Sequence, residues 1–202
     1  MKMVFMMVLR IMAAALAVGS LLVTAACGPR NGAPAVGSQP GQLDIVVAFY
    51  PLQFVAERLA GPYGAVHNLT EPGAEPHDLE LTPRQVADIA DADLVVFEHS
   101  LQPAVDAAVE QQGGDHVLDT ATVVPLQPLD EGQNHPETDA KGHGHDGLDP
   151  HVWLEPTNLA RIAAAVAARL AEVDPAHRTD FEANLATLTA DLTALDLSLI
   201  HI

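Results

Sequence analysis

The stretch LDIVVAF, from Leu43 to Phe49, is a short and nearly continuous apolar run, and it decides the fold class. Such a run is typical of a parallel strand that is buried on both faces. Pro51–Ala60 follows with a helical pattern that ends at Gly61, and Ala65–Thr70 is a second strand candidate. The order strand, helix, strand favours an α/β fold.

The alternation continues beyond the second strand. Thr82 can cap a helix, Pro83 suits the first helical position, and Gln85 stands where a capping box needs it. Leu94–Phe97 is a third strand candidate, and Pro103–Glu110 is the helix after it. Repeated strand–helix units predict a parallel sheet with helices on both faces.

Residues 156–202 are predicted to be helical throughout. The first helix, Pro156–Val173, has an apolar face made of Ile162, Val166, Leu170 and Val173. The second carries one seam of apolar residues spaced four and three apart: Phe181, Leu185, Leu188, Leu192, Leu195 and Leu199. A helix of about 25 residues, or ~37 Å, with one such seam needs a surface to lie on.

The chain stops at Ile202 with no capping residue and no returning strand. We therefore expect a truncated reading frame, with a further lobe absent. A natural small domain that ends in a helix is the alternative.

The N-terminal segment indicates export. Residues 1–26 have a basic start, an apolar region and small residues before Cys27, the only cysteine. This is the pattern of a lipobox, in which the cysteine is acylated, although Thr24 departs from the usual leucine or valine. The apolar run is 16 residues, whereas a membrane span needs roughly 20. An ordinary signal peptide and an uncleaved anchor are the alternatives. Residues 27–42 are predicted to be a flexible tether.

Charge narrows the classes of function. Lys2 and Arg10 are the only charged residues in the segment 1–26. The remaining 176 residues therefore carry 27 acidic and 7 basic side chains. The resulting charge of −20 argues against nucleic acid as a partner, since that requires basic patches. It suits a protein that handles cations, although many acidic surfaces serve only solubility.

Two histidines stand out by their setting. His77 lies in a loop between a strand and the capped helix, and His151 directly precedes a helix. Both follow a proline, which stiffens the preceding backbone. Ligands of parallel sheets bind beyond the carboxyl ends of strands, and imidazole is a common metal ligand. Considered alone, a loop histidine is more often a solvated polar residue, and no local ligand motif joins these two.

Residues 130–147 are too polar to form a core and are predicted to be a mobile loop. His135, His143 and His145 lie in it among five acidic residues. They are candidate accessory cation ligands; a solvated insert is the alternative.

Two motifs together are more specific than either histidine alone. Pro-Gly-x-x-Pro-His-Asp-x-x-Leu-Thr-Pro, at Pro72–Pro83, is followed by Asp-Pro-His-Val-Trp-Leu, at Asp149–Leu154. This pair resembles the zinc/manganese solute-binding lipoproteins of ABC importers, over about Leu43 to Leu195. The resemblance implies two α/β lobes joined by a long helix, with the metal between them. Residues 43–155 would then be the N-terminal lobe, and 156–202 would include the interlobe helix.

By this resemblance, His77 and His151 are metal ligands of the N-terminal lobe, with Glu75 as a candidate accessory ligand. The third and fourth ligands of the family would lie beyond Ile202. Zinc is the expected cargo because manganese prefers harder oxygen ligands, and manganese is the alternative. The implied partners are the ABC permease with its ATPase subunit, and the membrane through Cys27. We expect a lipid-anchored, extracytoplasmic monomer.

No motif of a hydrolase or a phosphate-binding loop is present in the sequence. We therefore expect a binding protein and not an enzyme. Two alternatives from other classes remain at this point. One is an extracytoplasmic zinc hydrolase that activates water, and the other is an adhesin-like surface lipoprotein with a structural metal.

Overall fold

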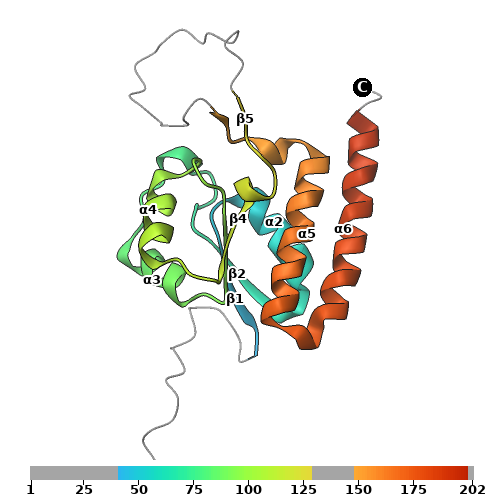
Figure 1. Ribbon diagram of the computed structural model, residues 1–202, viewed down its shortest axis with the longest axis horizontal. Helices are drawn as coiled ribbons and strands as arrows, with labels where there is room; N and C mark the ends of the chain where they lie inside the picture. The colour runs from blue at the N-terminus through green and yellow to red at the C-terminus, as the bar shows by residue number, and fades with distance from the viewer. Residues whose placement is uncertain (1–40, 129–147, 200–202) are drawn as a thin grey trace, which may run out of the picture. The chain divides into compact units, whose positions relative to one another are not determined.

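A parallel four-stranded sheet lies at the centre of the computed structural model (Figure 1). Strand β1 (Leu43–Val47) pairs with β2 (Gly64–Asn68) on one side and with β3 (Leu94–Phe97) on the other, and β4 (Val117–Asp119) pairs with β3. The spatial order is β2-β1-β3-β4. The predicted α/β class with a parallel sheet is therefore confirmed.

The structure describes residues 41–128 and 148–199. The predicted signal segment, Cys27 and nearly all of the tether lie outside these residues, as do residues 130–147 with their three histidines. Those assignments stay predictions, as do the domain boundaries.

Helices cover both faces of the sheet (Figure 1). On one side lie α3 (Pro83–Asp91) and α4 (Pro103–Gln112). On the other lie α2 (Tyr50–Ala60), α5 (Pro156–Val173) and α6 (Arg178–Leu199). Because both faces are covered, the inner parts of β1 and β3 are apolar. Ile45, Val47 and all four residues of β3 are accordingly buried.

Short elements connect these units. The 3-10 helices are η1 (Gly61–Tyr63), η2 (Pro76–Asp78), η3 (Thr120–Thr122), η4 (Val152–Leu154) and η5 (Pro175–His177). A two-stranded antiparallel ladder joins β5 (Gln127–Pro128) to β6 (Leu148–Asp149). This ladder and β4 were not predicted, because strands of two or three residues carry no readable periodicity.

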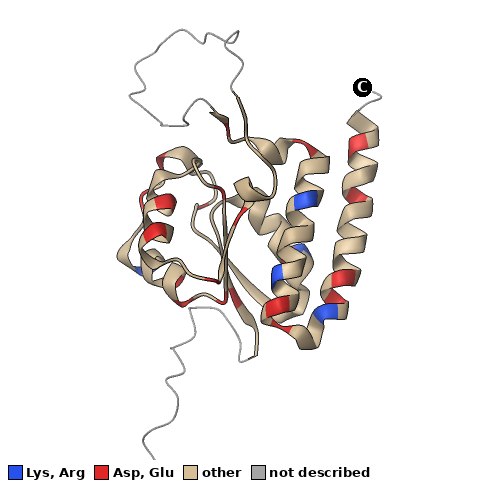
Figure 2. Cartoon of the chain, in the orientation of Figure 1, with Lys and Arg blue, Asp and Glu red and all other residues tan. Residues whose placement is uncertain are grey.

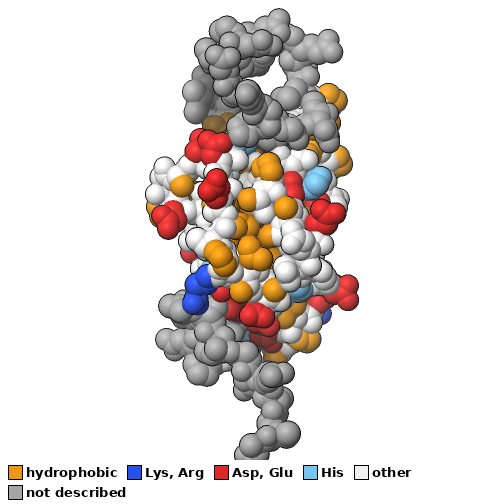
Figure 3. Space-filling model, turned by 90° about the vertical axis from the view of Figure 1, so that its left-hand side faces the viewer, with side chains coloured by type: hydrophobic (Ala, Val, Ile, Leu, Met, Phe, Trp, Pro, Cys, Tyr) orange, Lys and Arg blue, Asp and Glu red, His pale blue; other side chains and the backbone are white. Residues whose placement is uncertain are grey.

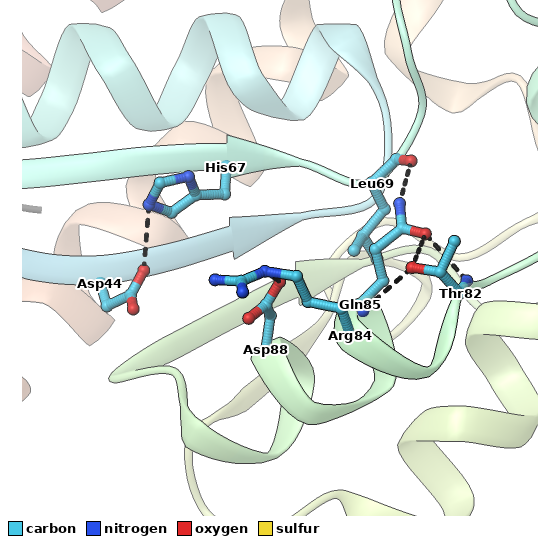
Figure 4. A network of polar contacts seen from close by, with 7 residues as sticks. All are labelled: Asp44, His67, Leu69, Thr82, Arg84, Gln85 and Asp88. Atoms are coloured by element: carbon cyan, nitrogen blue, oxygen red, sulfur yellow. Dashed lines mark hydrogen bonds and ion pairs between the residues drawn. The ribbon is translucent and has the colours of Figure 1, made fainter. Parts of the chain in front are cut away.

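The predicted capping box opens α3 (Figure 4). The Gln85 backbone N–H donates to the Thr82 hydroxyl at 3.3 Å, and the Thr82 backbone N–H donates to Gln85 Oε1 at 2.9 Å. Gln85 Nε2 also donates to the carbonyl of Leu69 at 2.8 Å. The same side chain thus caps the helix and ties it to the end of β2.

The apolar face of α5 is buried at Ile162, Val166 and Leu170, as predicted. Val173 is the exception, with 36% of its surface exposed. It is the last residue of the helix, directly before the C-cap Asp174, so little packs over it. The apolar face is therefore buried except at this last residue.

The seam of α6 is buried along only part of its length. Phe181, Leu188 and Leu192 are buried where the helix packs on α2 and α5, whereas Leu195 and Leu199 are about half exposed. The prediction of one continuous buried seam holds for the first turns only. Within the described residues, no helix is both long and apolar enough to cross a bilayer.

Candidate metal centre

His77 lies beyond the carboxyl end of β2, in the 3-10 helix η2. Pro76 precedes it and begins this helix, and Glu75 is the N-cap. The His77 backbone N–H donates to Glu75 Oε1 at 3.4 Å, which is a long bond. Glu75 therefore contacts the backbone of the predicted ligand, and its role as an accessory ligand remains a prediction.

His151 lies two residues after the end of β6, at the N-cap of η4. Asp149, two residues earlier, holds it through one oxygen. Asp149 Oδ1 accepts the His151 backbone N–H at 3.0 Å and lies 2.7 Å from ring Nδ1. A carboxylate that accepts Nδ1–H fixes the ring and leaves the Nε2 lone pair for a cation.

The structure brings His77 and His151 together. Their ring centroids are 5.5 Å apart, with 60° between the ring planes. Two imidazoles on one tetrahedral zinc, with Zn–N of about 2.0–2.1 Å, place their centroids roughly 5 Å apart. The two side chains are therefore spaced to share one cation with little movement.

Aromatic packing supports the second histidine. Trp153 lies 5.3 Å from the ring of His151 and 4.5 Å from that of Phe49, measured between centroids. Phe49 is buried at the carboxyl end of β1. Trp153 therefore anchors this segment on the core, through Phe49 at the end of the central strand.

A buried carboxyl group lies at the same edge of the sheet. Glu98 directly follows β3 and is 1% exposed, and its Oε2 accepts the Thr120 hydroxyl at 3.1 Å. Burial raises the pKa of Glu98 to about 8; the hydrogen bond from Thr120 lowers it, and the charges of Asp119 and Asp149 raise it. Asp149 thus acts electrostatically on Glu98 while it holds His151. Sequence reasoning missed Glu98, since nothing local marks a buried carboxyl.

Within the part of the chain that the structure describes, no third protein ligand joins the pair. Among residues 41–128 and 148–199, no three His, Cys, Asp or Glu side chains are grouped so that they could hold a metal ion. The candidate ligands His135, His143 and His145 lie outside these residues. Two imidazoles leave half of the tetrahedral shell of zinc to other donors.

The remaining described histidines have other partners, as expected for residues without a motif. His67 Nε2 lies 3.3 Å from Asp44 Oδ1 across β1 and β2 (Figure 4). Burial raises the pKa of Asp44, as do Asp93, Asp88 and Asp91, whereas His67 opposes this rise. His99 pairs with Asp106, His116 Nε2 contacts the carbonyl of Ile89, and His177 pairs with Asp174 and stacks on Tyr63.

One family model matches most of the chain. The model of the family ZnuA, "Zinc-uptake complex component A periplasmic", matches residues 45–200. The chain belongs to this family. The match includes η2 with His77 and η4 with His151, so both candidate ligands lie in the part of the chain that the ZnuA family shares.

Relatives of the ZnuA type differ in the metal that they are named for. The high-affinity zinc uptake system protein ZnuA of Bacillus subtilis is 31% identical over 178 residues, which are 87% of this chain and 56% of that protein. The manganese-binding lipoprotein MntA of Halalkalibacterium halodurans is 28% identical over 87% of this chain and 54% of that protein. The chain thus spans about half the length of these relatives.

A solved structure of the same type agrees with the fold. The crystal structure of Zn(II)-bound AdcA from Streptococcus pneumoniae is similar with a TM-score of 0.65 and 28% identity. The similarity covers 78% of this chain and 32% of the AdcA chain. A protein solved with Zn(II) bound therefore contains a similar arrangement of parallel sheet and covering helices.

Proposed function

We propose that this chain is the cation-capturing lobe of an extracytoplasmic solute-binding protein that delivers Zn²⁺ to an ABC importer. The observation that carries the proposal is the 5.5 Å approach of the His77 and His151 rings at the carboxyl edge of a parallel sheet. That edge is where α/β folds bind ligands. Membership of the ZnuA family supports the same conclusion.

The proposed chemistry is reversible coordination. His77 and His151 donate imidazole nitrogens, and Asp149 holds His151 in the tautomer that leaves Nε2 for the cation. Cargo must be released to the importer, so an incomplete shell on this lobe is an advantage. Other donors complete the shell, and the cation leaves when they move away.

Zinc is the proposed cargo and manganese the alternative. Imidazole suits zinc, whereas manganese prefers carboxylate and carbonyl oxygens. Relatives named for each metal are both similar to this chain, so family membership does not decide between them. The histidines of residues 130–147 favour zinc, and we propose that they gather cations near the site.

The proposed location is outside the cytoplasmic membrane, with a lipid on Cys27 as the tether. A tether raises the effective concentration of the protein at the permease and its ATPase subunit. Acidic side chains outnumber basic ones over the drawn helices and strands (Figure 2). The face over α3 and α4 likewise carries several acidic side chains around an apolar centre (Figure 3). This surface favours cations and disfavours nucleic acid.

A binding role is proposed over a hydrolytic one. A zinc hydrolase needs an activated water and a general base beside the metal. The nearest carboxylate partner of the pair is Asp149, which already accepts both N–H groups of His151. A structural metal in an adhesin-like protein is also less favoured, because both histidines are partly exposed.

Titration with Zn²⁺ and Mn²⁺ tests the proposal. We expect one Zn²⁺ per chain, tighter than Mn²⁺, and marked weakening in both His77→Ala and His151→Ala. His116→Ala is the matched control, since its ring contacts the carbonyl of Ile89. Unchanged affinity in both site variants, or hydrolysis of ester or peptide substrates that both abolish, would contradict the proposal.

A further inference from the structure

A buried glutamine joins the His77 loop to the ends of three strands. Gln102 is 1% exposed and uses both N–H groups of its side-chain amide. One donates to the carbonyl of Pro76 at 3.0 Å, and the other to the Thr70 hydroxyl at 2.9 Å. The Thr70 hydroxyl in turn donates to the carbonyl of Ala48 at 2.7 Å.

These hydrogen bonds connect the edge of the sheet to the His77 loop. Ala48, Thr70 and Gln102 follow β1, β2 and β3, so its fixed end is the carboxyl edge of the sheet. Its other end is the carbonyl of Pro76, in the peptide group that leads into His77. Orientation of that peptide plane sets where the His77 side chain leaves the backbone.

Two local hydrogen bonds also hold this part of the loop. The His77 backbone N–H donates to the exposed Glu75 Oε1 at 3.4 Å, and the Leu79 N–H donates to the Pro76 carbonyl at 3.4 Å. Gln102, by contrast, is buried and lies 26 positions away in the sequence. A buried amide whose donors are both satisfied is held rigidly, because breaking either bond leaves a desolvated group unpaired.

We infer that Gln102 is a positioning residue that sets cation affinity by holding the Pro76 carbonyl and thereby aiming His77. This inference rests on the proposed function, since it takes His77 as a ligand. The distinctive expectation is that Gln102 acts through His77 and has no effect of its own on binding.

Two variants of Gln102 remove the donor to Pro76. Gln102→Met keeps the length and removes both N–H groups, and Gln102→Glu keeps the shape but presents an acceptor to the Pro76 carbonyl. For the purified full chain titrated with Zn²⁺ alone against a chromophoric chelator, we expect about 10-fold weaker binding in either variant, as is usual when a ligand loses its supporting shell.

Two control variants separate an effect on the position of His77 from an effect on folding stability. Asn184→Leu removes another side-chain amide bond to a backbone carbonyl, that of Leu59, on the far helix α6. Thr70→Val removes the hydroxyl but leaves the Gln102–Pro76 bond. We expect both variants to lower the unfolding midpoint. Asn184→Leu should bind Zn²⁺ with wild-type affinity, and Thr70→Val should lose less affinity than the Gln102 variants do. Affinity losses that follow unfolding midpoints across all variants would overturn the inference.

Double variants provide the decisive test. In a His77→Ala background, Gln102→Met should cost no further affinity, whereas in a His151→Ala background it should still cost about 10-fold. An equal loss in both backgrounds, or wild-type affinity in Gln102→Met while His77→Ala weakens binding, would overturn the inference. If His77→Ala itself binds Zn²⁺ as wild type does, the proposed function fails first.

Discussion

The imidazole ring of His77 lies 5.5 Å from that of His151, although the two residues are 74 positions apart in the sequence. Each approaches from a different strand end, His77 after β2 and His151 after β6. The pair is therefore a product of the tertiary fold, and changes to residues that hold either loop should be felt at the other.

Asp149→Asn should weaken Zn²⁺ binding by about 10- to 100-fold, the range found when a carboxylate partner of a metal-binding histidine is removed. The amide retains a bond to His151 but no longer selects the tautomer with Nε2 unprotonated. Both side chains are more than 40% exposed, so folding stability should change little. Calorimetric titration measures the first quantity and urea unfolding the second.

Asp174→Asn is the matched control, because Asp174 pairs with His177 through the same Nδ1 geometry far from the site. It should bind Zn²⁺ as wild type does. Equal weakening in the two variants would mean that Asp149 acts through the general charge of the protein, and the orienting role would be wrong.

Glu98→Gln should flatten the dependence of stability on pH. Because burial holds the folded-state pKa of Glu98 at about 8, above its ordinary value of 4.5, the folded protein keeps a proton that the unfolded chain releases between these pH values. The contribution of Glu98 to stability should therefore be fully present below about pH 4.5, decrease as the pH rises to about 8, and be lost above it. The side-chain amide in Glu98→Gln does not ionise, so this variant should show no such loss of stability.

The difference in unfolding free energy between Glu98→Gln and the wild type gives the readout. At about 1.4 kcal/mol per pKa unit, Glu98→Gln should exceed wild type by a few kcal/mol at pH 8.5 and match it near pH 5. Urea unfolding without added metal, at several pH values, measures this. Parallel pH profiles in the two proteins would show that Glu98 ionises normally.

Leu188→Ala and Leu195→Ala should differ sharply although both lie on the seam of α6. Leu188 is fully buried, so its truncation should cost about 2–5 kcal/mol of unfolding free energy. Leu195 is 48% exposed, and its truncation should change stability by no more than about 0.5 kcal/mol. A similar loss in both would mean that the second half of α6 is covered in solution.

Much of the fold was predictable because its signals are local. The apolar run at β1, the capping box of α3 and the boundaries of α5 are each written within a few neighbouring residues. The order of strands and the pairing of β4 are not, since they depend on contacts between distant segments. The half-exposed end of the α6 seam was missed for a related reason: spacing shows which face is apolar, but not what covers it.

The two candidate ligands could be picked out from the sequence, but not all of the residues that support them could. His77 and His151 were found through two motifs, and their geometry follows from the sheet. Asp149 stands in the same motif as His151, so the sequence does contain a local indication of this carboxylate partner. Gln102 had no local signal at all, because its partners Thr70 and Pro76 are 32 and 26 positions away.

The most direct test of the site is the zinc X-ray absorption spectrum of the chain loaded with one equivalent of Zn²⁺. Imidazole rings give characteristic outer-shell scattering, so the ligands can be counted. A site shared by His77 and His151 predicts at least two imidazoles in the wild type and one fewer in each of His77→Ala and His151→Ala. An unchanged imidazole count in both variants would contradict it.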